Sequence, residues 1–375
     1  MSWKTVELNE VCDFQNGFAF KSNLFTAQGL PILRISNIQN QKIDTSSLVY
    51  FNKESYKERI EQYEVKPNDL LIAMSGATTG KIGFNNTDKI FYLNQRVGNF
   101  KPRNSLDKKY LYYFLSTQVE KNLSISAGAA QPNLSTEQIK GMLIPLPLIA
   151  TQQKIVAKLD AIFAEIDKAT AAAEANAKNA EALFQSFLKK VFEGNSLWIE
   201  NTLGKCFELY QPKTITTKDL IEDGKFQVYG ANGVIGRYDK YNHEHPQLLV
   251  TCRGATCGAV NVSSPFSWIN GNAMVVNSKT KDIDVRFVEY FFRGAVDLTK
   301  AITGAAQPQI TRQSLSPIIF KYPSLKTQQE IVALLDSLSA EIVKSKNSYR
   351  IKAVELTTLK QSILKQAFNG EFVKE

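Results

Sequence analysis

The sequence is poor in the residues that build several common kinds of site. Four cysteines in 375 residues are too few for a disulfide scaffold, so we expect reduced thiols. Only two histidines are present, and nothing in the sequence marks a catalytic triad around them. No apolar run reaches 18 residues and the N-terminus lacks the apolar stretch of a signal peptide, which predicts a cytoplasmic protein without a membrane segment.

Short motifs of nucleic-acid enzymes are also missing. Adenine methyltransferases carry an Asn/Asp-Pro-Pro-aromatic motif, and this chain has no Pro-Pro pair. The stretch GATTGKIG (76–83) resembles a phosphate-binding loop. However, three residues instead of four separate Gly76 from Gly80 and Lys81, and Ile82 replaces the required Ser or Thr. It therefore predicts a tight turn, and we expect a chain without an active site of its own.

A zinc site is a minor alternative. His243, His245, Cys252 and Cys257 are ligand types that suit tetrahedral zinc. In the first half of the chain, however, the positions equivalent to the two cysteines hold methionine and threonine. We therefore expect no metal, and buried structural thiols in its place.

Internal repetition is the strongest feature that is present. Residues 128–160 (GAAQPNLSTEQIKGMLIPLPLIATQQKIVAKLD) align without a gap on residues 304–336 (GAAQPQITRQSLSPIIFKYPSLKTQQEIVALLD), with 14 of 33 positions identical. At the same offset, LFQSFLKKVFEG (183–194) matches LKQSILKQAFNG (359–370) at 7 of 12 positions. The chain therefore contains one scaffold built twice.

Between these landmarks the halves agree only in part. LLIAMSGATTGKIGF (70–84) resembles LLVTCRGATCGAVNV (248–262), whereas NGFAFKSNLF has no counterpart in YQPKTITTKDL. Short apolar runs predict strands at 30–35, 70–74, 97–100, 248–252 and 273–276, and helical spacing appears at 108–120 and 285–296. We expect two mixed α+β regions that share a framework and differ in surface.

A long helix follows each globular region. Thr151 and Thr327 suit N-caps, Gly194 and Gly370 suit C-caps, and neither segment contains an internal Gly or Pro. The first helix should span roughly 63 Å at about 1.5 Å per residue.

A heptad pattern runs along both helices. Apolar or small residues alternate by fours and threes from 155 to 187, Asn176 included, and at the equivalent positions from 331 to 363. This predicts that the helices pair, and if they pair antiparallel about their midpoints, Asn176 would face Ser345 and Ala173 would face Tyr349. The alternative is two independent amphipathic helices, each packed on its own domain.

These features resemble the specificity subunits of type I restriction-modification systems. The resemblance rests on the GAAQP segments followed by P-x3-TQQ-x-IVA-x-LD, the SGATTG and RGATCG turns, and QSFL and QSIL segments that end in phenylalanine and glycine. It implies an α+β fold: two mixed α/β target-recognition domains in pseudo-twofold repeat, separated by two long antiparallel coiled-coil helices. The implied parts are recognition domain 1 (1–150), conserved helix 1 (151–194), recognition domain 2 (195–326) and conserved helix 2 (327–375).

The resemblance also implies a function. Such a chain is non-catalytic, and each recognition domain reads one half of a bipartite, asymmetric DNA site to direct adenine methylation or cleavage by partner subunits. The implied partners are double-stranded DNA, two modification (methyltransferase) subunits and the restriction (translocase and nuclease) subunits, with no membrane. The chain itself would hold no cofactor; S-adenosylmethionine, ATP and magnesium are expected on the partner subunits.

Phosphates are bound by Lys and Arg, and base edges are best read by Arg, Asn and Gln. On this basis we expect DNA contacts from Lys21, Arg34, Asn37, Lys81, Arg96 and Gln131 in the first half and from Lys213, Asn232, Arg237, Arg253, Gln307 and Arg312 in the second. For each, the alternative is a solvated side chain or one that satisfies a turn. Gln131 and Gln307 recur in domains that should read different bases, so a loop-fixing or phosphate-binding role suits them better.

The remaining alternative is a purely structural or protein-binding scaffold on the same helices. The formal net charge of +9 permits an anionic partner, but it would also suit many proteins that bind no nucleic acid. Matched frameworks with divergent polar surfaces favour a DNA-binding protein whose two halves differ in specificity.

Overall fold

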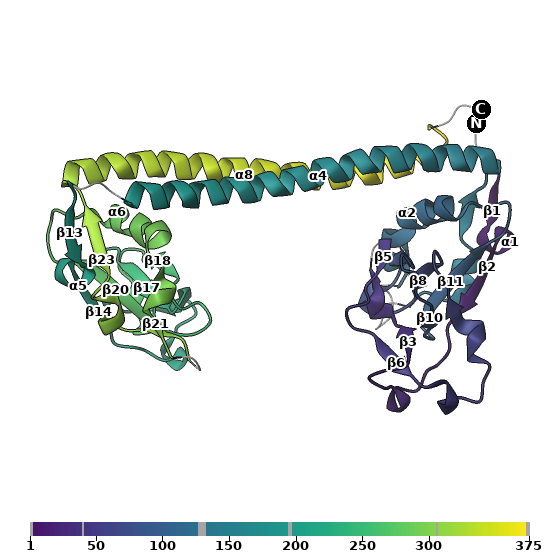
Figure 1. The fold of residues 1–375 in the computed structure, drawn as a ribbon, viewed down its shortest axis with the longest axis horizontal. Helices are drawn as coiled ribbons and strands as arrows, with labels where there is room; N and C mark the ends of the chain where they lie inside the picture. Colours follow the sequence, from purple (N-terminus) through teal and green to yellow (C-terminus); the bar gives the residue numbers. More distant parts are fainter. Residues whose placement is uncertain (1–2, 40, 127–132, 194–196, 305–306, 373–375) are drawn as a thin grey trace. The chain divides into compact units, whose positions relative to one another are not determined.

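The structure is a computed structural model of the chain. It describes residues 3–39, 41–126, 133–193, 197–304 and 307–372. They form two compact units: unit 1 comprises Met1–Ala172 and Lys352–Glu375, and unit 2 comprises Ala173–Ile351. Each unit combines a globular part with portions of two long helices (Figure 1).

The long helices are α4 (Ile149–Phe192) and α8 (Leu325–Phe368). Both begin two residues before the predicted caps. The hydroxyl of Ser324 accepts a hydrogen bond from the backbone N–H of Thr327 at 3.4 Å, so Ser324 caps α8. The prediction that Thr151 and Thr327 are N-caps is therefore wrong, since both lie in the first helical turn.

Each helix is uninterrupted over 44 residues, which corresponds to about 66 Å at about 1.5 Å per residue. Gly370 follows the end of α8 with a φ of 82°, the left-handed conformation expected of a C-terminal cap. Gly194, the other predicted cap, lies outside the described residues. The two long helices predicted from the sequence are thus confirmed.

Within each unit the two helices pair antiparallel. In unit 1, Lys360 of α8 forms an ion pair with Asp167 of α4, and the Lys158 ammonium donates to the carbonyl of Phe372 at 2.9 Å. In unit 2, Lys346 forms an ion pair with Glu181. Because the steps from Asp167 to Glu181 and from Lys346 to Lys360 are equal, both pairs fit one antiparallel register. The alternative of two independent helices is not supported.

The buried stripe departs from the predicted heptad in the second half of each helix. Leu183 is 68% exposed and Leu359 is 46% exposed, whereas their neighbours Phe184 and Lys360 are buried or half-buried. Asn176 is likewise exposed. A straight α-helix drifts relative to a 3.5-residue repeat, so a strict heptad loses the buried face along a long helix. The predicted placement of Ala169, Asn176, Leu183, Lys352 and Leu359 in the stripe is therefore wrong.

The globular part of unit 1 is built mainly on two sheets. A six-stranded sheet has the order β2-β11-β8-β9-β5-β4 and a four-stranded sheet the order β6-β3-β10-β7, while β1 and β12 form a separate pair. The elements are β1 (Thr5–Glu7), α1 (Leu8–Val11), β2 (Cys12–Asn16), β3 (Leu30–Leu33), β4 (Ile38–Gln39), β5 (Gln41–Ile43), β6 (Val49–Phe51), β7 (Glu64–Val65), β8 (Leu70–Ala73), β9 (Ile82–Phe84), β10 (Phe91–Leu93), β11 (Val97–Pro102), α2 (Lys108–Ser126), α3 (Thr136–Lys140) and β12 (Leu143–Pro145).

Unit 2 repeats much of this plan with fewer strands. Its sheets have the orders β14-β20-β17-β18 and β16-β15-β19, with β13-β23 and β21-β22 as separate pairs. The elements are β13 (Ile199–Thr202), α5 (Leu203–Cys206), β14 (Phe207–Tyr210), β15 (Phe226–Gly230), β16 (Gly233–Tyr238), β17 (Leu248–Thr251), β18 (Val260–Val262), β19 (Trp268–Ile269), β20 (Ala273–Ser278), α6 (Val285–Tyr290), β21 (Ile302–Thr303), β22 (Gln309–Ile310), α7 (Arg312–Leu315) and β23 (Ile319–Tyr322).

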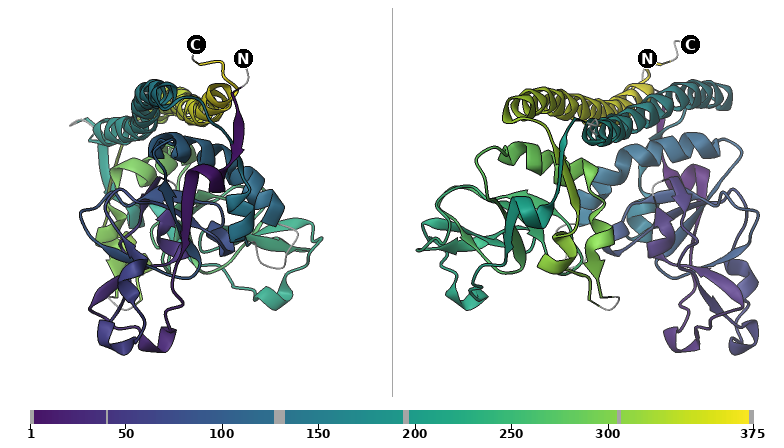
Figure 2. Two further views of the ribbon diagram at one scale, coloured as in Figure 1. Left: turned by 90° about the vertical axis from the view of Figure 1, so that its right-hand side faces the viewer. Right: turned by 60° about the vertical axis from the view of Figure 1, so that its left-hand side comes forward.

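The strand order β2-β11-β8-β9 in unit 1 corresponds to β14-β20-β17-β18 in unit 2. Each unit also has a parallel strand pair, β3 with β10 and β15 with β19. In both units a helix, α2 or α6, lies between the sheets and the long helices (Figure 2). The predicted mixed α+β repeat is confirmed, and the sheets of unit 1 carry the additional strands β4, β5 and β7.

The predicted helix at 285–296 divides in two. α6 ends at Tyr290, and a π-helical turn follows over Phe291–Ala295. A Cβ atom at Gly294 would lie 2.5 Å from the Cβ of Leu188 on α4, so only glycine allows this close approach. Packing against α4 therefore accompanies the altered helix geometry.

A buried glutamine joins each long helix to its globular part. The Gln152 side chain donates to the carbonyls of Ser105 and Pro147, both at 2.9 Å, and accepts from the N–H of Asp107 at 2.8 Å. In unit 2 the equivalent Gln328 donates to the carbonyls of Asp282 and Pro323 and accepts from the N–H of Asp284. Both glutamines are fully buried.

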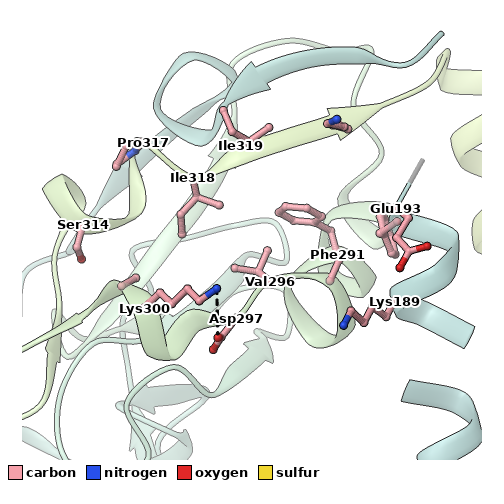
Figure 3. A pocket seen from close by; sticks show the side chains of 14 residues that line it. Lys189, Glu193, Phe291, Val296, Asp297, Lys300, Ser314, Pro317, Ile318 and Ile319 are labelled. Atoms are coloured by element: carbon pink, nitrogen blue, oxygen red, sulfur yellow. Dashed lines mark ion pairs between the residues drawn. The ribbon is translucent and has the colours of Figure 1, made fainter. Parts of the chain in front are cut away.

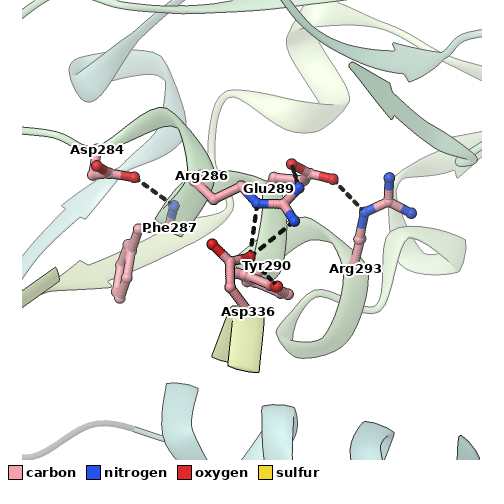
Figure 4. A network of polar contacts seen from close by, with 7 residues as sticks. All are labelled: Asp284, Arg286, Phe287, Glu289, Tyr290, Arg293 and Asp336. Carbon is pink, nitrogen blue, oxygen red and sulfur yellow. Dashed lines mark hydrogen bonds and ion pairs between the residues drawn. The ribbon is translucent and has the colours of Figure 1, made fainter. Parts of the chain in front are cut away.

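The aspartate of the Leu-Asp sequence at 159–160 and 335–336 makes a second connection between each long helix and its globular part. Asp336 of α8 accepts hydrogen bonds from Arg286 at 2.9 Å and from the Tyr290 hydroxyl at 2.6 Å (Figure 4). Burial raises the pKa of Asp336, but these hydrogen bonds together hold it below its usual value. Glu289, nearly buried, lies between Arg286 and Arg293. In unit 1 the equivalent aspartate, Asp160, bonds Lys109 and Tyr113.

The C-terminal end of the opposite helix completes each unit. Phe368, near the end of α8, packs on Tyr110 and Phe114 of α2, with ring centroids 4.9 and 5.7 Å apart. Phe192, at the end of α4, packs on Phe287 and Phe291 at 4.9 and 5.7 Å. Each globular part is thus attached to the start of one long helix and the end of the other.

Within the ranges that the structure describes, no helix combines the length and apolar content needed to cross a membrane.

Candidate nucleic-acid interface

Three segments of unit 1 meet beside the end of β8. The backbone N–H of Met74 bonds the carbonyl of Arg96 at 2.9 Å, and the N–H of Leu134 bonds the carbonyl of Met74 at 2.8 Å. Ser75 and Asn133 form a β-bridge. The turn at 74–80, the turn at 94–96 and residues 133–134 therefore lie side by side, and we call them turn cluster 1.

Unit 2 contains the same arrangement beside the end of β17. The N–H of Cys252 bonds the carbonyl of Asn272 and the N–H of Ile310 bonds the carbonyl of Cys252, both at 2.9 Å. Arg253 and Gln309 form the β-bridge that corresponds to Ser75 and Asn133. We call the turn at 252–258, the turn at 270–272 and residues 307–310 turn cluster 2.

The predicted tight turns are confirmed. Gly76 and Gly80 have φ values of 73° and 80°, and Gly254 and Gly258 have values of 86° and 90°. Glycine adopts this left-handed conformation without the steric cost that other residues meet. Each turn leads into a strand, β9 or β18, whereas a phosphate-binding loop leads into a helix.

Three of the six side chains predicted to contact DNA in the first half lie at turn cluster 1. Arg96 is exposed, and its guanidinium donates to the Asn133 side chain at 3.2 Å. Lys81, directly after the turn, has its ammonium 3.5 Å from the Gln39 side-chain oxygen. Arg34 is half-buried next to Ile35, whose carbonyl accepts from the Thr78 hydroxyl of the turn at 3.1 Å.

In the second half, Arg253 and Gln307 gather at turn cluster 2. Arg253 is exposed in the turn itself, and Gln307 is exposed two residues before Gln309. Arg312 is exposed at the first position of α7, directly after β22. These three side chains are available to a ligand on the described surface.

Two predicted contacts have structural roles instead. Asn37 is fully buried: it accepts from the Arg34 backbone N–H and donates to the carbonyl of Asp44, both at 3.0 Å. Arg237 uses its guanidinium on the carbonyls of Gly224 and Lys225. The Asn37 side chain is therefore not accessible, whereas Arg237 stabilises the turn at Gly224 and Lys225 and is still exposed.

Of the other predicted residues, Lys213 and Asn232 lie in segments beside turn cluster 2. Gln211 and Thr214 bond Gly271, and the carbonyl of Ala231 accepts from the Thr251 hydroxyl. Lys21 and Lys213 are exposed in the segments after β2 and β14. Asn232 is exposed and accepts from the Asn261 side chain at 3.0 Å. Gln131 lies outside the described residues.

Sequence reasoning missed four polar residues of the turn clusters. Ser75 and Asn133 in unit 1, and Asn272 and Gln309 in unit 2, border the repeated motifs. Their signal was available: Ser75 directly follows an apolar run, Asn272 directly precedes one, and Asn133 and Gln309 lie two residues beyond the GAAQ of a repeat.

The zinc alternative is not supported. Both ring nitrogens of His243 are engaged, one with the Tyr210 hydroxyl at 2.8 Å and one with the Asn242 side chain at 2.7 Å. Burial raises the pKa of the Cys252 thiol to about 11 and keeps it protonated. All four cysteines are free. In the part of the chain that the structure describes, no three His, Cys, Asp or Glu side chains are placed to hold a metal.

A pocket of about 720 Å³ in unit 2 lies elsewhere (Figure 3). The end of α4, the π-helical turn and β23 line it, and it shares no residue with turn cluster 2. Its lining mixes apolar side chains with both signs of charge, including Lys300 and Asp297 at 3.9 Å. This composition does not indicate one class of ligand.

The family that the sequence matches is found once in each half of the repeat. The sequence matches the family described as "Type I restriction modification DNA specificity domain" over residues 1–176 and 195–354. It is 25% identical over 421 residues to the type I restriction enzyme StySPI specificity subunit of Salmonella potsdam, covering 100% of this chain and 90% of the relative. The MjaVIII specificity subunit of Methanocaldococcus jannaschii is 33% identical over 167 residues, covering 43% of this chain and 39% of the relative.

Solved structures share the fold. The HsdS subunit of Thermoanaerobacter tengcongensis covers 99% of this chain and 97% of its own, with a TM-score of 0.58 and 20% identity. A structure from a study of complex assembly and conformational transition of the type I R-M system covers 99% and 98%, with a TM-score of 0.76 and 20% identity. The chain therefore belongs to the type I restriction-modification specificity family, the non-catalytic subunits that recognise DNA sequence.

Proposed function

We propose that units 1 and 2 each read one half of a bipartite, asymmetric DNA site through their turn clusters. One observation carries this proposal: the two clusters share their backbone hydrogen bonds but present different side chains. Arg253 stands where unit 1 has Ser75, and Asn272 stands where unit 1 has Arg96. Arginine pairs best with guanine and asparagine with adenine, so the two surfaces suit different bases.

The chemistry belongs to partner subunits in this proposal. Two modification subunits would bind the chain and methylate adenine, and restriction subunits would cleave, with S-adenosylmethionine, ATP and magnesium held by those partners. The near-identical connections of Gln152 and Gln328, and of Asp160 and Asp336, support two equivalent positions for two copies of one partner. Such a complex acts on DNA in the cytoplasm.

Exchange of one globular domain is the experiment that tests the proposal. Replacing residues 1–147 with the corresponding domain of another family member should change one half of the recognised site and leave the other half unchanged, because each unit has its own core and its own turn cluster. Mapping of methylated adenines in a host that expresses the chimera with its partner subunits measures this. The control is the reciprocal exchange of residues 197–323. Loss of both half-site preferences in a folded, assembled chimera would contradict separate reading.

A single substitution tests the role of Arg253. Arg253→Ser gives unit 2 the residue of unit 1, and we expect a loss of about 1–3 kcal/mol of discrimination at one base pair of one half-site. Lys300→Ser, in the pocket outside the cluster, is the control with the same change in charge. Binding to duplexes with each base pair varied, over a series of salt concentrations, is the measurement. A uniform loss at all sequences with a salt slope reduced by about 1 would show that Arg253 contacts phosphate instead.

A further inference from the structure

A tight β-hairpin of unit 2 ends against turn cluster 2. Ala231 and Asn232 alone connect β15 to β16. The carbonyl of Ala231 accepts from the hydroxyl of Thr251, which directly precedes one turn of the cluster. The carbonyl of Tyr229 accepts at 2.9 Å from the N–H of Asn270, the first residue of the other turn. The hairpin tip is therefore fixed against both turns of the cluster.

Two side-chain amides meet at this tip. Asn261 of β18, in the other sheet, donates to the side-chain oxygen of Asn232 at 3.0 Å. An amide oxygen has two lone pairs and an amide nitrogen two donors, so this bond uses only part of the capacity of Asn232. The Asn232 side chain is exposed. It is therefore oriented by Asn261 and can still both accept and donate hydrogen bonds toward a ligand.

This combination matches adenine in duplex DNA. In the major groove adenine presents its N6 amino donor next to its N7 acceptor, and one asparagine side chain binds both. The major groove is also wide enough to admit a two-stranded β-ribbon. A hairpin with an oriented asparagine at its tip has the shape and the chemistry for this contact.

An apolar side chain lies beside the tip. A β-bulge in β16 brings Ile235 across Gly230, where an added Cβ atom would lie 2.6 Å from the Ile235 Cγ2. Ile235 is 46% exposed, and its neighbour Val234 on this edge strand is 50% exposed. Thymine, the partner of adenine, presents a methyl group in the major groove that apolar side chains contact. The amide and the apolar side chain thus suit the same base pair.

The charge around the tip favours a negatively charged ligand. Lys213 and Arg253 are exposed on segments that border it. The segments that meet here contain no Asp or Glu; they are 211–216, 229–235, 251–261 and 269–272. Acidic residues instead flank the other end of the hairpin, before β15 and after β16; they are Glu222, Asp223, Asp239 and Glu244.

Unit 1 is built differently at this position. Its corresponding strands, β3 and β6, are joined by residues 34–48, which include β4 and β5 and the buried Asn37. The tight tip therefore belongs to the part of the scaffold that differs between the units. An element that reads only one half-site should have this distribution.

We propose that the tip of the β15–β16 hairpin enters the major groove of the half-site read by unit 2 and recognises an A·T base pair. Asn232 binds N6 and N7 of the adenine, and Ile235 contacts the methyl group of the paired thymine. Asn261 is a positioning residue that orients the Asn232 amide. The proposal rests on the reading of that half-site by turn cluster 2.

The test uses the full chain assembled with its modification subunits and duplexes in which each base pair of the mapped methylation site is varied. Asn232→Ala should lose about 5- to 150-fold of preference for A·T at one base pair, the range for one bidentate contact. Asn232→Asp no longer donates to N7 but accepts from the cytosine amino group, so the preferred pair there should change to C·G. Asn277→Asp, the same change at an exposed residue of β20 away from the cluster, is the control and should keep the preference.

Modified bases test the individual atoms. With the unaltered chain, 7-deazaadenine in place of that adenine, or uracil in place of that thymine, should weaken binding. Asn232→Ala should be insensitive to the first change and Ile235→Ala to the second, because the contact is already absent. Asn261→Ala should lower discrimination at the same base pair and add nothing to Asn232→Ala in the double variant. A merely structural role of Asn261 would lower affinity for all duplexes alike.

Unchanged preference at every base pair in both Asn232 variants would overturn the proposal. An equal loss of affinity for all duplexes would also overturn it, because Asn232 would then contact the DNA backbone. Weakened assembly with the modification subunits at unaltered base preference would make the tip a protein contact instead. A complex of the unaltered chain without preference for its methylation site would contradict the proposed function itself.

Discussion

Replacement of Gln328 by alanine is expected to lower the free energy of unfolding of unit 2 by roughly 3–5 kcal/mol. The substitution leaves the carbonyls of Asp282 and Pro323 and the N–H of Asp284 without their partner. Each buried backbone group left unsatisfied costs about 1–3 kcal/mol. Because the site is fully buried, water reaches these groups only if α8 separates from the globular part. Denaturant unfolding of the full chain, with hydrogen exchange to locate the change, measures the effect.

The chain supplies its own matched controls for this prediction. Gln329, the next residue, is exposed, and Gln329→Ala should change stability by no more than about 0.5 kcal/mol. Unit 1 offers the same pair, with Gln152 buried and Gln153 exposed. Gln152→Ala should therefore destabilise unit 1 selectively, and Gln153→Ala should not. Equal unfolding curves for Gln328→Ala and Gln329→Ala would show that the buried glutamine does not hold the helix.

Lengthening both long helices is expected to change the recognised DNA site without changing the bases read. Four residues inserted between Ala172 and Ala173, together with four between Ile351 and Lys352, add roughly 6 Å at about 1.5 Å per residue. Both insertions lie at the border between the units, away from the glutamine and aspartate connections. If α4 and α8 set the gap between the half-sites, that gap should grow by one to two base pairs at about 3.4 Å per base pair. Methylation should move completely to the longer site, and adenine mapping shows this directly.

An insertion in one helix alone is the matched control. It shifts α4 against α8 by about one turn on one side and breaks the register that joins Lys360 to Asp167 and Lys346 to Glu181. Such a chain should be less stable, since the stripe of buried residues no longer matches its partner. An active double-insertion variant with an unaltered gap would mean that the spacing is set by the docking of the domains or by the partner subunits.

Features that depend on local sequence were predictable. The glycine-rich turns could be predicted because only glycine adopts their φ values easily. The long helices could be predicted because no Gly or Pro interrupts them. The pairing of the helices followed from a heptad that both share, and the antiparallel orientation from the resemblance to the family. The N-cap of α8 was misplaced by three residues, since Ser324 and Thr327 both suit a cap and local sequence did not decide between them.

Roles that depend on distant residues were not predictable. Asn37, at the end of a short 3-10 helix, and Arg237, in β16, have side chains whose direction is decided by carbonyls of neighbouring turns. The function of Gln152 depends on Ser105, which is 47 residues away in sequence. The π-helical turn at Gly294 reflects the approach of α4. In each case the sequence contains the residue type, and only the tertiary structure supplies its partner.

The attachment of each globular part to the start of one helix and the end of the other has a consequence for the gene. The codons for the glutamine, aspartate and phenylalanine anchors occur twice, within two stretches of similar sequence. A crossover between the first copy at 152–160 and the second at 328–336 would delete one globular part and one helix. The shortened product would keep one complete set of anchors, but the end of its single helix would lie far from the globular part that precedes that helix. Two such products, aligned head to tail, would satisfy each other's anchors, so recombination within one gene could yield a symmetric protein that recognises a palindrome.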